Sequence, residues 1–335
     1  MNADLHELKE MHTYKRPYGS QSEAEYIARF LLPLGLTRDP FGNLYKVIGD
    51  KPVTMWSSHT DSVHHNAGRQ NVVIDGKMLK LHKKSNASCL GADDAAGNWI
   101  MMQMIRAGVP GLYIFHYAEE VGAVGSSDIA AKAPDFVKGI TSAIAFDRKG
   151  YDSIITHQGG RTASDAFAAS LGLQLEGYKA DDKGIFTDTR SYKSLIPECT
   201  NLSVGYFNAH SSKEVLDFEH LFKLRDMMLA IDQTKFVIER DPKQVATFTG
   251  SNRTSAPKTL ADFLWTYPDD AATVLEMMGV PVADFGALVL EARDRRWDAA
   301  REKKRAKNAK QGAPTLTDLF DGDDDDVVVD IRQSA

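Results

Sequence analysis

The chain has 335 residues and a formal net charge of −6, with 43% hydrophobic and 26% charged residues. These values are typical of globular proteins and exclude a collagen-like, wholly disordered or coiled-coil chain. They also give no overall basic field, so neither nucleic acid nor an anionic membrane is an expected partner.

The cysteine content and the N-terminus indicate the compartment. Only Cys89 and Cys199 are present, which is too few for a disulfide framework and favours a reducing environment. The first 15 residues are polar, and no stretch approaches 18 apolar residues. Neither a signal peptide nor a transmembrane helix is therefore expected, and we predict a cytoplasmic protein.

Helical and strand patterns alternate along the first 240 residues. Apolar residues at helical spacing predict a first helix over 20–36. Short runs rich in β-branched and aromatic residues predict strands at Asn43–Ile48, Val53–Ser58, Leu112–Tyr117, Thr141–Phe146, Asp152–Thr156 and Leu202–Phe207. Helical patterns between and after them cover Ala95–Ala107, Ser164–Leu173 and Val215–Asp232. This alternation predicts a three-layer α/β fold with helices on both faces of a mostly parallel mixed sheet.

The composition changes after Gln244, which divides the chain into three parts. Residues 1–245 are predicted to form the α/β domain. A Thr/Ser/Asn-rich stretch followed by apolar residues predicts a small helical segment over 246–290. Residues 291–335 join a basic run to an acidic run with few aromatics, which is typical of a charged, disordered tail.

Five short polar motifs lie just beyond predicted strands. They are His59-Thr60-Asp61, Gly91-Ala92-Asp93-Asp94, Glu119-Glu120, Asp147 and His210. Ligands of open α/β sheets bind at the carboxyl ends of the strands, so these motifs are expected to form a single site. Two histidines and several carboxylates without clustered cysteine suit a zinc-type ion, or two such ions sharing a carboxylate. Such a metal pair supports hydrolase chemistry.

Each motif alone also has a simpler interpretation. Asp94 precedes an Ala-rich helix and is a natural N-cap, and paired glutamates are often solvated. Asp188 either lines a substrate pocket or caps a turn. Cys89 lies close enough in sequence to the motif of Asp93 to suggest a Cys–His nucleophile with His59, but a small buried residue explains it more simply.

The order of the motifs from His59 to His210 resembles one known layout. The segments WSSHTDSVHH, LGADDAAGNWIMM, YAEEVGAVGSSD, AIAFDRKG and VGYFNAHSSKEVLD carry the resemblance. Together they are similar to the co-catalytic di-zinc exopeptidases. That clan includes leucyl aminopeptidase, tripeptide peptidase, deblocking aminopeptidases and acylase-type carboxypeptidases.

The resemblance implies a set of metal ligands. Asp93 would bridge two divalent ions, with His59 and Asp147 completing one site. Glu120 and His210 would complete the other. Zinc is the expected metal, and cobalt or manganese would also tolerate these ligands.

The resemblance also implies two catalytic residues outside the ligand set. Glu119 would be the general base that moves a proton from the attacking water to the leaving amine. Asp61 lies two residues beyond His59, and would orient the His59 ring by accepting a hydrogen bond from one ring N–H. Asp188 lies in a segment that resembles a substrate-binding one, which makes it a candidate substrate contact.

Spacing narrows the branch of the clan that the chain resembles. His59 and Asp93 are 34 residues apart, and Asp147 and His210 are 63 apart. Both distances are too short for the insertions that several branches carry there, so a compact catalytic domain without a lid insertion is expected. An aspartate at 147, where carboxypeptidase and acylase relatives tend to have glutamate, favours an aminopeptidase.

We therefore predict a zinc-dependent exopeptidase, an aminopeptidase that acts on peptide substrates. A carboxypeptidase or an N-acyl amino acid amidohydrolase is the alternative among hydrolases. A scaffold protein that keeps the fold for interactions is the alternative outside enzymes. The side-chain preference and the oligomeric state stay open.

Overall fold

The computed structural model describes residues 3–184 and 186–243. They belong to a compact unit of residues Met1–Thr249, and a second unit covers Gly250–Ala335. The predicted helical segment 246–290 and charged tail 291–335 lie outside the described residues.

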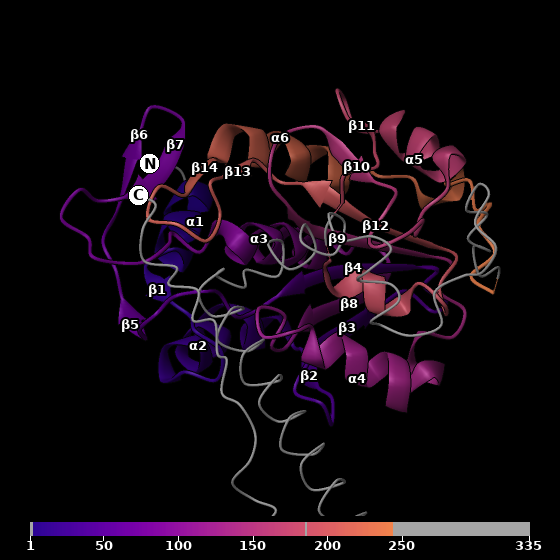
Figure 1. Cartoon of the computed structure of the whole chain (residues 1–335), viewed down its shortest axis with the longest axis horizontal. Helices are drawn as coiled ribbons and strands as arrows, with labels where there is room; N and C mark the ends of the chain where they lie inside the picture. Colours follow the sequence, from indigo (N-terminus) through magenta and orange to yellow (C-terminus); the bar gives the residue numbers. More distant parts are fainter. Residues whose placement is uncertain (1–2, 185, 244–335) are drawn as a thin grey trace, which may run out of the picture. The chain divides into compact units, whose positions relative to one another are not determined.

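An eight-stranded mixed sheet forms the centre of the described fold, in the order β11-β10-β12-β9-β4-β8-β3-β2 (Figure 1). The strands are β2 Thr37–Arg38, β3 Leu44–Ile48, β4 Thr54–His59, β8 Gly111–His116, β9 Ser142–Arg148, β10 Ser153–Ile155, β11 Lys179–Asp181 and β12 Glu198–Ser203. The central strands β12, β9, β4 and β8 run parallel, whereas β3 is antiparallel to β8 and β10 to β12. The predicted mostly parallel mixed sheet is confirmed.

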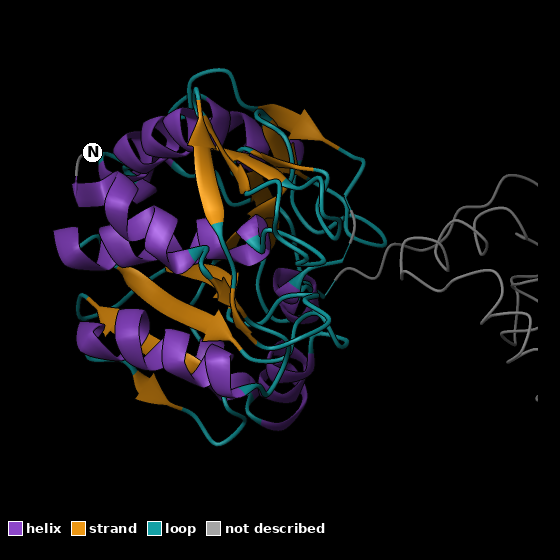
Figure 2. Cartoon of the chain, turned by 90° about the vertical axis from the view of Figure 1, so that its left-hand side faces the viewer, coloured by secondary structure: helices purple, strands orange, loops and turns teal. Residues whose placement is uncertain are grey.

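Helices cover both faces of this sheet (Figure 2). On one face, α3 (Ala92–Ala107) packs against β4 and β9, and both α1 (Ala3–Met11) and α6 (Phe218–Leu229) pack against α3. The core residues of α5 (Asp165–Gly172) join the same cluster. The other face carries α4 (Val124–Lys132) with the 3₁₀ turns η3 (Pro134–Val137) and η4 (Asp188–Tyr192), and the short turn η5 (Gln233–Lys235) follows α6.

Adjacent residues of one strand pack into two separate hydrophobic clusters, one on each face of the sheet. On β4, Trp56 packs in the cluster beneath α3, and its neighbour Met55 packs in the cluster on the α4 face. Tyr113 and Leu112 divide in the same way on β8. Every residue of β4 and β8 is buried, as expected for strands of a sheet with helices on both faces.

The first predicted helix, over 20–36, changes its winding along its length. It starts as α2 (Gln21–Tyr26), where the Ser20 side chain accepts the Glu23 N–H. It continues as a π-helical turn, Ile27–Leu31, and a 3₁₀ turn, Leu32–Leu34. Pro33 has no N–H to continue the α-helical ladder, and Gly35 ends the segment at φ 72°.

A second, four-stranded sheet was not predicted. Its order is β13-β14-β7-β6, with β6 Val72–Asp75, β7 Met78–Leu81, β13 Tyr206–Phe207 and β14 Val215–Asp217. A two-stranded ribbon pairs β1 (Tyr14–Lys15) with β5 (Gly68–Arg69). Strands of two to four residues are too short to show periodicity, although Asp75-Gly76 is a hairpin signal that was available.

Two predicted elements next to these short strands have other bounds in the structure. The strand predicted over 202–207 starts earlier, as β12 at Glu198, and its end belongs to β13. The helix predicted from Val215 starts at Phe218, because Asp217 caps it by accepting the His220 N–H. Helices α1 and α4 were missed. Among the described residues, no helix has the length and apolar character needed to cross a membrane.

Candidate active site

The carboxyl ends of the central strands bring the predicted residues to one edge of the sheet. Strand β4 ends at His59, which stands in register with His116 at the end of the parallel strand β8. Glu119 and Glu120 follow β8 directly, and Asp147 lies near the end of β9. The expected convergence of these motifs at one sheet edge is therefore observed.

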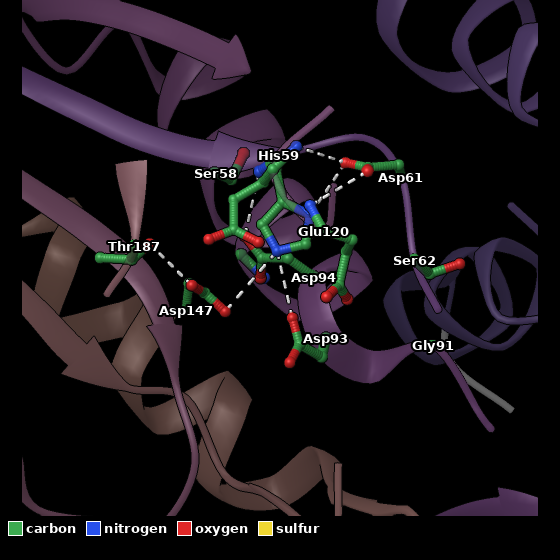
Figure 3. Close-up of polar contacts among 12 residues, drawn as sticks. Ser58, His59, Asp61, Ser62, Gly91, Asp93, Asp94, Glu120, Asp147 and Thr187 are labelled. Atoms are coloured by element: carbon green, nitrogen blue, oxygen red, sulfur yellow. Dashed lines mark hydrogen bonds and ion pairs between the residues drawn. The ribbon is translucent and has the colours of Figure 1, made fainter. Parts of the chain in front are cut away.

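Asp93 lies between two histidines. The Nε2 atom of His59 is 3.1 Å from Asp93 Oδ1, and the Nε2 atom of His210 is 3.1 Å from Asp93 Oδ2. Figure 3 shows the first of these contacts. One carboxylate thus presents a separate oxygen to each histidine.

Two groups of possible metal ligands share this carboxylate. His59, Asp93 and Asp147 form one group, and Asp93, Glu120 and His210 form the other, with the ligand atoms of each group within 4.8 Å of one another. Within the groups, His59 Nε2 lies 3.7 Å from Asp147 Oδ1, and His210 Nε2 lies 3.4 Å from Glu120 Oε2. These five residues are the ones that the sequence proposed. Their binding of metal stays a prediction.

Asp94, the next residue in the chain, holds the turn that presents Asp93. Helix α3 is interrupted at Asp93 and Asp94, which have non-helical φ/ψ and are joined by a cis peptide bond. The Asp94 carboxylate accepts the N–H of Gly97 at 2.9 Å, as an N-cap does, and the N–H of His59 at 3.2 Å. A Cβ at Gly97 would lie 2.5 Å from Asp94 Oδ1, so this close approach requires glycine. Asp94 therefore joins the turn before α3 to the end of β4.

Asp61 connects the first group to the two glutamates. Its two oxygens accept the backbone N–H groups of Glu119 at 3.1 Å and Glu120 at 3.2 Å. Its Oδ1 also lies 3.4 Å from His59 Nδ1 (Figure 3). A carboxylate beside Nδ1 favours the tautomer with the proton there, which leaves Nε2 free to bind a metal.

Asp147 is held from three directions. The side chain of Asn201 accepts the Asp147 N–H and donates to its carbonyl oxygen, both at 2.9 Å. The Thr187 hydroxyl donates to Oδ2 at 2.7 Å, and the Tyr206 hydroxyl donates to Oδ1 at 3.2 Å. These contacts fix the carboxylate with its Oδ1 facing His59.

His210 differs from the other candidate ligands because its side chain is 53% exposed. It has a positive φ of 62° in the loop between β13 and β14. Four residues on, the Glu214 carboxylate is buried and accepts the N–H groups of Leu90, Gly91 and Asp93. Glu214 was missed by the sequence analysis, although it lies in a segment that carried the resemblance.

The electrostatics of the site are dominated by buried carboxylates. Burial raises the pKa of Glu119 well above its usual range, although the nearby His59 lowers it. Burial and the Asp93 charge also raise the pKa of Glu120. Burial lowers the pKa of His59, but hydrogen bonds with Asp147 and Asp61 hold it well above its usual value. Hydrogen bonds with Asp93 and Glu120 raise the pKa of His210 to about 11.

This donor set fits divalent cations. Buried like charges need a compensating cation, and the carboxylates outnumber the histidines here. Glu120 Oε1 is buried without a hydrogen-bond partner in the described structure. Nitrogen and oxygen ligands without cysteine are those that zinc and related ions accept. The residues present therefore fit divalent cations, in two groups of candidate ligands that share Asp93.

Asp188 lies deeper than a residue on an open pocket wall. It is the first residue of η4, is only 1% exposed, and has its Oδ2 3.3 Å from His116 Nδ1. Burial raises its pKa to about 8. Its direct contact with a substrate stays a prediction.

Cys89 is buried, as the simpler interpretation required. Burial raises the pKa of its thiol far above the usual range, and the Glu214 charge adds to this effect. A thiol in this environment is not a reactive thiolate, which argues against a Cys–His nucleophile.

Comparison with known proteins places the fold. No protein-family model matches the chain, and no curated protein matches it. Solved structures do match. Aminopeptidase PepT from Bacillus cereus is 15% identical with a TM-score of 0.55, over 68% of this chain and 96% of that one. A tripeptidase from Staphylococcus aureus is 15% identical with a TM-score of 0.56, over 69% and 97%.

A third structure, the TET1 peptidase of Pyrococcus horikoshii, is 15% identical with a TM-score of 0.51, over 68% of this chain and 98% of that one. That protein assembles into a tetrahedron or a large octahedral shell. The described chain therefore has the α/β fold of these peptidases, as the sequence predicted.

Proposed function

We propose that this protein is a metal-dependent aminopeptidase that hydrolyses the N-terminal peptide bond of its substrates. The observation that carries the proposal is the Asp93 carboxylate, whose two oxygens each face a histidine in a different group of candidate ligands. Glu119 follows β8, as Glu120 does, but it belongs to neither group of candidate ligands. A carboxylate shared by two ligand groups suits a pair of metal ions, and a carboxylate outside both groups is free to move a proton.

The metal ions would be held by the five candidate ligands. His59 and Asp147 would bind one ion, Glu120 and His210 the other, and Asp93 both. When bound, such a pair of ions polarises a carbonyl and lowers the pKa of water. Zn²⁺ is our proposed metal because its borderline character suits imidazole together with carboxylate.

Glu119 would act as the general base. Its backbone N–H is held by Asp61, and its carboxylate lies within electrostatic range of His59 and Asp147. It would take a proton from the attacking water as the water oxygen bonds to the carbonyl carbon. It would then give this proton to the leaving nitrogen as the peptide C–N bond breaks. A side chain bound to a metal would not be free to do this.

Peptides with a free N-terminus are the proposed substrates. PepT of Bacillus cereus is an aminopeptidase and the Staphylococcus aureus relative is a tripeptidase, and both share this fold. The aspartate at position 147 also favours an aminopeptidase over a carboxypeptidase or an acylase. We also propose a cytoplasmic location, because Cys89 and Cys199 are both free thiols.

Mass spectrometry of a peptide pool tests this function. Peptides with free and with acetylated N-termini would be incubated with zinc-loaded protein and with a chelated control. We expect N-terminal trimming of the free peptides only, abolished by chelation. C-terminal trimming would instead identify a carboxypeptidase, and release of acetate an amidohydrolase. Absence of any cleavage by protein that has bound metal would contradict the enzyme proposal and favour a scaffold role.

A further inference from the structure

Arg16 has a fully buried charged side chain that the proposed reaction does not use. Its side chain is 0% exposed, on the segment between β1 and α2. The Nε–H donates to the carbonyl oxygen of Thr60 at 3.0 Å, and Nη2 donates to that of Gly91 at 2.9 Å. A buried charge is costly unless its partners are well placed, so these contacts define the position of the guanidinium.

Both carbonyl groups belong to the segments that carry the candidate ligands. Thr60 lies between His59 and Asp61, and Gly91 lies two residues before Asp93. The two segments are about 30 residues apart in the chain, and the guanidinium of Arg16 spans the distance between them. Figure 3 shows the two segments beside the site, at Ser62 and Gly91.

The main chain of Arg16 holds the first segment as well. Its N–H donates to His64 Nδ1 at 3.3 Å, and its carbonyl oxygen accepts the Ser62 N–H at 2.8 Å. The Thr60 hydroxyl donates to Glu23 Oε1 at 2.7 Å. Thr60 is therefore hydrogen-bonded to both an arginine and a glutamate side chain. The guanidinium also lies 4.6 Å from the centre of the Tyr26 ring, which orients its plane.

We propose that Arg16 is a positioning residue for the metal centre, because it sets the separation of the segment bearing His59 and Asp61 from the segment bearing Asp93. This inference rests on the proposed function. An arginine is required because its planar fork offers donors at fixed angles to two carbonyl groups at once. A lysine ammonium is a single point of charge on a flexible stem and does not fix that separation.

Metal affinity measures this role directly. Co²⁺ would be titrated into the metal-free protein, and its visible absorption would report both the affinity and the coordination geometry. The variant is Arg16→Lys, which keeps the charge and removes the fork. We expect it to bind Co²⁺ 10- to 100-fold more weakly than the parent, with an altered spectrum, because residues that orient metal ligands have effects of this size. Arg16→Gln, which removes the buried charge, serves if the lysine variant does not fold.

Arg240→Lys is the matched control. The Arg240 guanidinium also donates to backbone carbonyls, those of Lys193, Ile196 and Pro197. These residues lie between η4 and β12, and β12 starts at the end of the sheet opposite to the site. Arg240→Lys is expected to lower the thermal midpoint and to leave the Co²⁺ affinity and spectrum unchanged.

The outcomes separate the inference from the proposed function. Parent affinity and spectrum in a folded Arg16 variant would overturn the role of Arg16 and leave the metal centre standing. Equal losses of affinity in the Arg16 and Arg240 variants would overturn it as well, because general destabilisation would then explain both. A parent protein that binds no Co²⁺ would overturn both the metal centre and the inference. Co²⁺ binding weakened only by the Arg16 variants supports the inference, whether or not peptides are cleaved.

Discussion

The backbone N–H of Asp93 donates to the Glu214 carboxylate at 3.1 Å. The other carboxylate oxygen of Glu214 accepts the N–H groups of Leu90 and Gly91, both at 2.8 Å. Glu214 lies four residues beyond His210. The loop that carries His210 is therefore hydrogen-bonded to the turn that presents Asp93, so Glu214 supports two of the three residues of the second candidate ligand group.

Glu214→Gln is expected to weaken both folding and metal binding. A glutamine amide has one acceptor oxygen where the carboxylate has two, so at least one of the three buried N–H groups is left facing an NH₂ group. A buried donor without a partner costs about 1–3 kcal/mol of the free energy of unfolding. Denaturant unfolding of the metal-free protein measures this loss, and Zn²⁺ titration measures the affinity.

Glu198→Gln is the control for that variant. Glu198 is also fully buried, and its carboxylate accepts N–H groups from Ser164, Glu239 and Arg240. It lies at the start of β12, away from the site. The loss of stability should be similar, with Zn²⁺ affinity unchanged. If Glu214→Gln and Glu198→Gln bind Zn²⁺ with equal affinity, Glu214 stabilises the fold but does not support the metal site.

Glu119→Gln should separate metal binding from catalysis. The residue lies outside both groups of candidate ligands, so the variant is expected to keep its full complement of Zn²⁺ by elemental analysis. Turnover should fall by about 10²–10⁴-fold, because a glutamine cannot accept the proton from water. Asp93→Ala is the comparison, since it should lose both metal and activity. Parent turnover in Glu119→Gln would remove Glu119 from the mechanism.

The ends of strands made the candidate ligands predictable. His59 and Asp147 directly follow segments whose composition predicts strands, and parallel strands bring the residues at their carboxyl ends to one edge of the sheet. The grouping of the ligands around Asp93 came from the resemblance to the di-zinc exopeptidases, which the order of the motifs carries. The position of a residue relative to a strand in the sequence determines which end of that strand it occupies.

The supporting residues were beyond the reach of sequence patterns. Arg16 contacts Thr60 and Gly91, which are 44 and 75 residues away, and Glu214 contacts Asp93 across 121 residues. Nothing local marks an arginine or a glutamate as buried. Polar residues usually lie at the surface, so a single sequence predicts exposure for both. Their burial follows from tertiary packing, as does that of His64, which hydrogen-bonds to Gln70.

Removing the charged C-terminal segment should leave the activity intact. The sequence predicts that residues 291–335 cannot contribute much core, because they combine opposite charge blocks with few aromatics. A chain that ends at residue 290 is expected to fold, to bind Zn²⁺ and to trim peptides at the parent rate. Peptide hydrolysis and far-ultraviolet circular dichroism test this. An insoluble or unfolded product would show that the segment belongs to the folded protein.

Buried His12 predicts a loss of stability in mild acid. It is 0% exposed and its Nδ1 lies 2.7 Å from the carbonyl oxygen of Leu8. Burial, assisted by the Arg16 charge and opposed by the hydrogen bond to Leu8, lowers the pKa of His12 from 6.5 to about 3. Below about pH 6.5 the unfolded chain therefore binds a proton that the folded chain does not. The free energy of unfolding falls as the pH drops from 6.5 towards 3, by about 2 kcal/mol at pH 5 from this residue.

His12→Gln isolates that contribution. The glutamine does not titrate, so denaturant unfolding at pH 7.5 and at pH 5 should show a loss about 2 kcal/mol smaller than in the parent. The same comparison for the exposed His65, as His65→Gln, should leave the pH dependence unchanged. Other buried groups titrate alike in parent and variant, so they cancel from the difference. An identical fall in stability for all three proteins would mean that His12 is protonated in the folded state, in conflict with its burial against Leu8 and beside the Arg16 charge.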